Sequence, residues 1–126
     1  MSDGASDLLT ALRRVDERQE RANEVSKGVF IYEPSHEPWG VVHFVGGAGF
    51  GSYPDLAYGS LLAQLSEDAG DACVATAYDL GLDHDNEART VGERFENIMR
   101  VKGWDGPVLG VGHSLGAKLL LLRSCE

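Results

Sequence analysis

Three short apolar runs, each followed by a loop and a helix-like stretch, constrain the fold of this chain more than any other feature. The runs are WGVVHFVGG (39–47), ACVATAYD (72–79) and PVLGVGH (107–113). Apolar runs with little polar alternation are typical of strands that are covered on both faces of a parallel sheet. Helical periodicity follows in 55–70, in 87–103 and from Leu115 onward. This alternation predicts an α/β fold, a three-layer αβα sandwich with a mostly parallel sheet and right-handed crossovers.

The helical stretches carry boundary signals as well as periodicity. Asp55 is predicted to cap the first helix, and Gly70 and Gly103 are predicted to end the first and the second. The apolar residues that share a helical face are Leu56, Leu61, Leu62 and Leu65 in the first helix and Val91, Phe95, Ile98 and Met99 in the second. These two faces are expected to cover the sheet.

The beginning of the chain differs from the rest. The stretch 5–26 is polar, and its apolar residues recur at helical spacing only at Leu8, Leu9, Leu12 and Val15. We therefore expect residues 1–27 to form either a polar helix lying on the domain or a disordered arm. The folded domain is expected to span 28–126, beginning with a strand in GVFIYEP (28–34) that the proline closes.

The composition excludes some functions. A net charge of −9 argues against nucleic acid and anionic membranes as partners, because an acidic surface repels both. The two cysteines and four histidines have no metal-ligand spacing, so we expect no metal, no cofactor and no disulfide framework. No apolar run approaches the ~18 residues of a membrane span, and the acidic N-terminus lacks a signal core. We expect a soluble chain in a reducing compartment.

The stretch GHSLG matches the G-x-S-x-G pattern and lies between a predicted strand and a predicted helix, which is the context of a nucleophile elbow. Ser114 would sit on a sharp turn with its hydroxyl above the sheet, and Gly112 and Gly116 remove side chains that would collide there. The N–H of Leu115, at the helix start, is a candidate oxyanion donor. His113 is interpreted as a packing residue, because adjacent residues in this turn point apart. The alternative is that the serine occupies a tight turn without chemistry.

A glycine-rich loop, HFVGGAGFG (43–51), directly follows the first buried run. In hydrolases that have a nucleophile elbow after one strand of a parallel sheet, the loop after a neighbouring strand supplies a second oxyanion donor. Glycines in that loop keep side chains away from the substrate oxygen. Gly46, Gly47 and Ala48 are the candidates, and we assign the donor to the N–H of Gly47. A rival interpretation is nucleotide binding, because a G-x-G-x-x-S pattern begins at Gly47; the third glycine of the dinucleotide fingerprint is missing.

The loop after the second run, DLGLDHDNEA (79–88), concentrates acidic residues around a histidine. It holds Asp79, Asp83, His84 and Asp85. An Asp-His couple could orient a base or bind a metal, and His84 could substitute as the base because it lies at the same edge of the sheet as Ser114. The alternative is a solvated loop that caps the next helix.

Four stretches combine these features: GVVHFVGGAGFGSYPDLAYGSLLAQL (40–65), VATAYDLGLDHDNEA (74–88), ERF (93–95) and VGHSLGAKLLLL (111–122). Together they resemble the domain of unknown function 1350 family, an α/β-hydrolase group of plants, algae and cyanobacteria. The resemblance implies that 28–126 is the N-terminal part of an α/β-hydrolase domain. It places Ser114 at the nucleophile position, Gly46 and Gly47 in the glycine loop, and Asp83-His84 in an Asp-His loop. It implies cytoplasm or plastid stroma, and no particular substrate.

In this fold the catalytic acid and the histidine base follow the serine along the chain. Only twelve residues follow Ser114, so we expect a truncated α/β-hydrolase fold, a fragment that is inactive as it stands. The leading hypothesis is a serine hydrolase of an ester, a thioester or an amide. The alternative from another class is a non-catalytic module that works through a protein partner.

The same fold would place the strand at 39–47 between those at 72–79 and 107–113. The strand at 107–113 would then be an uncovered apolar edge. We therefore expect self-association through that edge.

Overall fold

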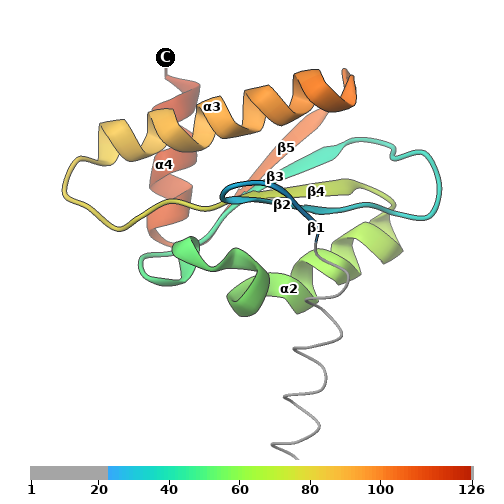
Figure 1. The fold of residues 1–126 in the computed structure, drawn as a ribbon, viewed down its shortest axis with the longest axis horizontal. Helices are drawn as coiled ribbons and strands as arrows, with labels where there is room; N and C mark the ends of the chain where they lie inside the picture. The colour runs from blue at the N-terminus through green and yellow to red at the C-terminus, as the bar shows by residue number, and fades with distance from the viewer. Residues whose placement is uncertain (1–22, 126) are drawn as a thin grey trace, which may run out of the picture.

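The five strands of the computed structural model, which describes residues 23–125, form one sheet in the order β1-β2-β4-β3-β5. They are β1 (Asn23–Ser26), β2 (Val29–Tyr32), β3 (Val41–Val45), β4 (Ala72–Thr76) and β5 (Val108–Gly112). β3 is parallel to β4 and β5, and β2 is antiparallel to both β1 and β4, so β2 alone runs against the other strands. The predicted position of the first apolar run, between the other two, is confirmed (Figure 1).

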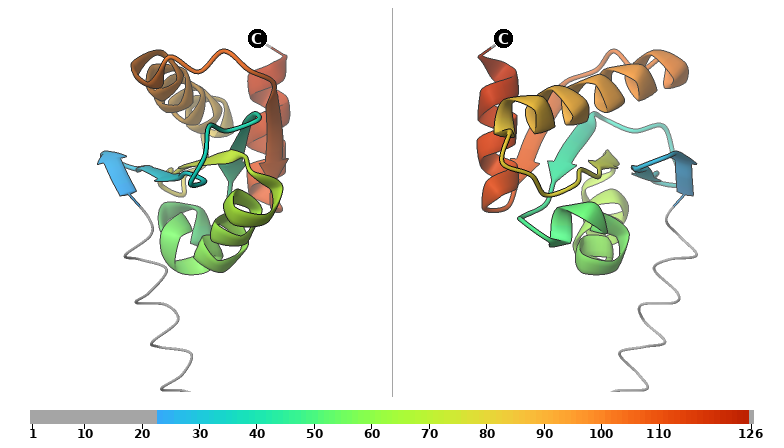
Figure 2. Two further views of the ribbon diagram at one scale, coloured as in Figure 1. Left: turned by 90° about the vertical axis from the view of Figure 1, so that its right-hand side faces the viewer. Right: turned by 60° about the vertical axis from the view of Figure 1, so that its left-hand side comes forward.

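Helices cover both faces of this sheet, which confirms the predicted three-layer α/β arrangement (Figures 1 and 2). The helices are α2 (Pro54–Gln64), α3 (His84–Lys102) and α4 (Leu115–Ser124), with a 3-10 turn η1 (Phe50–Ser52) before α2 and a π-helical turn η2 (Leu65–Ala69) after it. On one face Leu62 of α2 packs with Phe44 of β3. On the other face Ile98 of α3 packs with Val41, and Leu119 of α4 packs with Val45.

The central strands explain why their sequences lack polar alternation. Every residue of β3 and β4 is buried, because successive side chains point to opposite faces and each face has a helix over it. The one imidazole among them belongs to His43, whose Nε2 is 2.9 Å from Thr76 Oγ1 and whose ring stacks on Phe95. Burial, together with the charge of Arg123, lowers the pKa of His43 to about 3, so this side chain is neutral and structural.

The helix ends follow the predictions in all but one case. Gly70 and Gly103 adopt left-handed φ values of 76° and 67° and end η2 and α3. Asp55 does not cap α2: Tyr53 is the N-cap and Pro54 is the first helical residue. Proline suits that position because its missing N–H has no intrahelical acceptor, and Asp55 in the first turn still faces the positive helix end.

The leucines of α2 correct another prediction. Leu62 is fully buried, but Leu56 and Leu61 are each 46% exposed. The periodicity therefore overstated how much of this helix faces the sheet.

The start of the folded part also differs from the prediction. Residues 23–26, expected to belong to a helix or an arm, form β1 and pair with β2 across a turn at Gly28, whose φ is 76°. Pairing with β2 decides this structure, and no periodicity in the short segment signals it. The predicted helix or arm at 1–22 lies outside the described residues.

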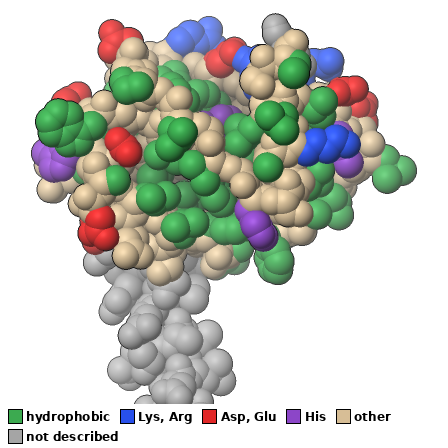
Figure 3. All heavy atoms as spheres, turned by 180° about the vertical axis from the view of Figure 1, so that it is seen from behind, with side chains coloured by type: hydrophobic (Ala, Val, Ile, Leu, Met, Phe, Trp, Pro, Cys, Tyr) green, Lys and Arg blue, Asp and Glu red, His purple; other side chains and the backbone are tan. Residues whose placement is uncertain are grey.

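β5 forms an open edge of the sheet. Its strand neighbour within residues 23–125 is β3, and Val108 and Leu109 are 48% and 63% exposed. Leu121, on the neighbouring α4, is 67% exposed. Hydrophobic side chains are spread over this side of the molecule (Figure 3). The uncovered apolar edge that the strand order predicted is therefore present.

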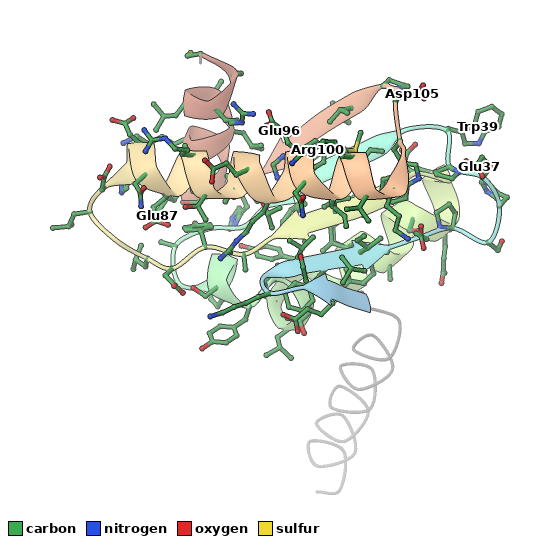
Figure 4. The ribbon with its side chains drawn as sticks, turned by 45° about the horizontal axis from the view of Figure 1, so that its top comes forward. Glu37, Trp39, Glu87, Glu96, Arg100 and Asp105 are labelled. Carbon is green, nitrogen blue, oxygen red and sulfur yellow. The ribbon has the colours of Figure 1, made fainter. Side chains whose placement is uncertain are left out.

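The two ends of the sheet have different characters. At the amino ends of β3 and β5, Glu37, Trp39 and Asp105 line one shallow hollow (Figure 4). The carboxyl ends of β3 and β5 instead lead into the glycine loop and the GHSLG turn. None of the helices in the described part of the chain is long and apolar enough to cross a membrane.

Candidate active site

Ser114 lies on a sharp turn between the end of β5 and the start of α4. Its φ of 56° and ψ of −119° make it the only residue other than glycine with a positive φ within residues 23–125. A side chain in this region of backbone space is strained and persists only where its surroundings hold it. Here the N–H of His113 donates to Val45 O at 3.1 Å, and the N–H of Ala117 donates to Ser114 O at 3.0 Å.

The two glycines of the turn are needed for different reasons. A Cβ on Gly112 would lie 2.5 Å from the backbone nitrogen of Ala117, on the helix that follows the serine. A Cβ on Gly116 would instead collide with the carbonyl oxygen of Val45, at the end of the neighbouring strand β3. The turn is therefore packed against its own helix on one side and against β3 on the other.

The glycine loop after β3 lies beside this turn. A Cβ on Gly47 would be 3.3 Å from His113 Nδ1 and 3.5 Å from Ser114 Cβ. Two segments that are more than sixty residues apart in the chain thus meet at the carboxyl edge of the sheet, which is where open α/β sheets bind ligands.

The predicted oxyanion donors differ in whether they already form a hydrogen bond within the protein. The N–H of Leu115 is at the first position of α4 and donates to no protein acceptor in the described part of the chain. The N–H of Gly47 donates to the hydroxyl of Tyr58 at 2.9 Å. Gly46 contributes its carbonyl, which accepts from the hydroxyl of Tyr78 at 2.8 Å.

The two tyrosines are the residues that the sequence analysis missed. Burial, followed by the effects of Tyr58 and Glu87, raises the pKa of Tyr78 to about 12, so its hydroxyl stays protonated and donates. A Cβ on Gly46 would collide with the ring of Tyr58. Bulky rings facing residues without side chains are a packing signal that becomes visible only once the fold is known.

His113 is exposed and turned towards Tyr58. Its Nδ1 is 3.0 Å from the Tyr58 hydroxyl, and the two rings meet edge to face. This hydrogen bond engages one ring nitrogen of His113 with the tyrosine that also accepts from Gly47.

The Asp-His pair of the second loop does not form a couple. The carboxylate of Asp83 accepts from the N–H of Asn86 at 3.0 Å and caps α3, as the capping alternative predicted. His84 Nδ1 is 2.9 Å from Nζ of Lys118, on α4. Within residues 23–125, no group of three His, Cys, Asp or Glu side chains could hold a metal ion.

The cysteines add no chemistry to this site. Cys73 is buried in β4, and Cys125 is exposed at the far end of the chain. Burial, and then the charge of Asp71, raises the pKa of Cys73 to about 12, so its thiol stays protonated.

The strand order, the helices on both faces and the turn after β5 define an α/β-hydrolase-like fold. Within this class, the chain belongs to the family described as "Protein of unknown function (DUF1350)", whose model matches residues 22–125. No curated protein matches the chain.

A solved structure supports the fold. The chain is similar to the crystal structure of a "putative thioesterase" from Silicibacter sp. TM1040, with a TM-score of 0.66 and 22% sequence identity. The match covers 95% of this chain and 50% of that one, so the chain spans half the length of its solved neighbour.

Proposed function

We propose that the chain carries the nucleophile half of a serine hydrolase, with Ser114 attacking an ester, a thioester or an amide. The observation that carries this proposal is the strained backbone of Ser114 at the carboxyl end of β5. Strain of this kind is costly and concentrates at active sites. The fold shared with a "putative thioesterase" makes acyl thioesters the first substrates to assay.

In this mechanism Ser114 Oγ attacks the carbonyl carbon, and its proton passes to a histidine base. The carbonyl oxygen becomes an oxyanion, which the N–H of Leu115, unpaired within residues 23–125, stabilises together with a donor from the glycine loop. In this fold the acid and the base follow the nucleophile along the chain. We therefore place both outside residues 23–125, and we expect residues 23–125 alone to retain only the rate that oxyanion stabilisation provides.

Labelling with a fluorophosphonate tests the role of Ser114. We expect mass spectrometry to locate the label on Ser114, and Ser114→Ala to abolish it. Ser60, which is exposed on α2, is the matched control because its backbone is helical and unstrained. Labelling of Ser114 no faster than that of Ser60, in a protein that includes the acid and the base, would contradict the proposal.

A non-catalytic role is the second candidate, and the open edge at β5 favours it. The run 107–112 contains no charged residue to block pairing. Two copies of one edge can pair antiparallel about a two-fold axis, which satisfies both backbones at once. We propose that β5 pairs with β5 of a second copy. Sedimentation velocity on the chain should then show a dimer, and a monomer at all concentrations would exclude it.

A further inference from the structure

Two tyrosine hydroxyls hold a single peptide unit of the glycine loop. The carbonyl of Gly46 accepts from Tyr78 at 2.8 Å, and the N–H of Gly47 donates to Tyr58 at 2.9 Å. These two groups belong to the same planar peptide unit, on opposite sides of it. The two hydrogen bonds therefore fix the orientation of the unit from both ends.

The tyrosines themselves are anchored. The ring of Tyr58 packs on Phe44 with centroids 4.6 Å apart. The ring of Tyr78 occupies the space where a Cβ on Gly51 would be. The backbone of Tyr78 is bonded twice more, because its carbonyl accepts from Ser52 Oγ at 2.7 Å and its N–H donates to Gly51 O at 3.2 Å. Neither hydroxyl can leave the loop without disturbing this packing.

The next peptide unit, between Gly47 and Ala48, is held at its carbonyl and, in the described part of the chain, not at its N–H. The carbonyl of Gly47 accepts from the N–H of Gly51 at 2.6 Å, so it points into the turn. The N–H of Ala48 lies on the other side of that planar unit and points out of the turn. Ala48 is exposed, and its N–H donates to no protein group within residues 23–125. It is the free donor adjacent to Gly47, which itself lies beside Ser114.

We propose that Tyr58 and Tyr78 are positioning residues that clamp the Gly46–Gly47 peptide, and that the glycine loop offers Ala48 N–H beside Ser114. This rests on the proposed function for the identity of the oxyanion, and it revises the assignment of the donor to Gly47. The clamp also joins the loop to the turn, because the Tyr58 hydroxyl touches His113, the residue before the serine.

Amide hydrogen exchange, measured by NMR on the full chain, tests the clamp without any reaction. Gly47 N–H should exchange slowly and Ala48 N–H rapidly, since only the first is hydrogen-bonded. Tyr58→Phe keeps the ring and removes the hydroxyl, so exchange at Gly47 should rise about tenfold while Ala48 is unchanged. Tyr53→Phe is the control, because Tyr53 is 62% exposed and its hydroxyl has no partner in the described part of the chain. Equal exchange at Gly47 and Ala48 in the unaltered chain would overturn the clamp, even if Tyr58→Phe did not fold.

The fluorophosphonate adduct of Ser114 tests the donor. Its phosphoryl oxygen stands in for the oxyanion, so the adduct should slow exchange at Ala48 and Leu115 and leave Gly47 as it was. Protection gained at Gly47 and not at Ala48 would overturn the proposal while leaving the serine hydrolase intact. If no adduct forms in a protein that includes the acid and the base, the proposed function fails, and with it Ala48 as an oxyanion donor; the exchange contrast still decides whether the clamp exists.

Discussion

β3 and β5 are neighbouring parallel strands with similar sequences, VVHFV and VLGVG, and very different surroundings. Val41 pairs with Val108 in register, yet the first is 3% exposed and the second 48%. β3 has a strand on each side and helices over both faces, whereas β5 has β3 on one side only within residues 23–125. An apolar run therefore predicts a strand that can be buried. How much of the strand is buried depends on the strands and helices beside it.

The turn after β5 meets the end of β3 at Gly116. Gly116→Ala would place a methyl group against the carbonyl oxygen of Val45, at the end of β3. Backbone cannot move aside as a side chain can, so we expect a loss of about 3 kcal/mol or more, despite the better helix propensity of alanine. Denaturant unfolding measures it. Gly106→Ala is the control, because a Cβ there meets nothing closer than 3.7 Å. Equal stability of the two variants would show that α4 does not sit tightly on β3.

His43, in the buried strand β3, makes the stability of the folded chain depend on pH. Its pKa is about 3 in the folded chain and about 6.5 when unfolded, so the unfolded chain binds the extra proton between these values. The contribution of His43 to the free energy of unfolding is fully present above pH 6.5. It is lost as the pH falls, and the free energy of unfolding is about 2–3 kcal/mol lower at pH 4.5. Comparing unfolding curves of the unaltered chain and His43→Gln isolates this group from the carboxylates. Parallel pH profiles would contradict burial of a neutral imidazole.

Much of the fold could be predicted because its signals are local. The three apolar runs, Gly70 and Gly103 each act through their own residue types, and each became the expected element or helix end. β1 could not be predicted, since a four-residue segment with one apolar side chain, Val25, becomes a strand only by pairing with β2. The exposed leucines of α2 likewise depend on where the sheet ends, which the helical period does not encode.

The candidate site also has one part that the sequence predicts and one part that it does not. The GHSLG stretch contains its own turn geometry, so the position of Ser114 between strand and helix followed from the sequence. The state of the glycine loop did not, because it depends on the hydroxyls of Tyr58 and Tyr78, which arrive from other elements. The roles of Ser114, Leu115 and the loop in catalysis remain predictions.

The register pair offers a matched test of the difference between the strands. Val41→Ala should cost about 2 kcal/mol, because it removes buried methyl groups and leaves a cavity under α3. Val108→Ala should cost less than about 0.5 kcal/mol, since a half-exposed side chain loses little burial. Denaturant unfolding of both variants compares them directly. A large loss at Val108 would mean that something covers the edge in solution.

Leu109→Lys should have the smallest effect on folding and a specific effect on association. Leu109 is 63% exposed, so lysine should change the unfolding free energy of the monomer by less than about 0.5 kcal/mol. A charge on an open edge opposes strand pairing, so the proposed dimer should dissociate. Leu82→Lys is the control, because Leu82 is fully exposed and belongs to the loop before α3, not to β5. If both variants sediment as the unaltered chain does, the edge is not the contact. If Leu109→Lys alone becomes monomeric, the open side of β5 is where this chain meets its second copy.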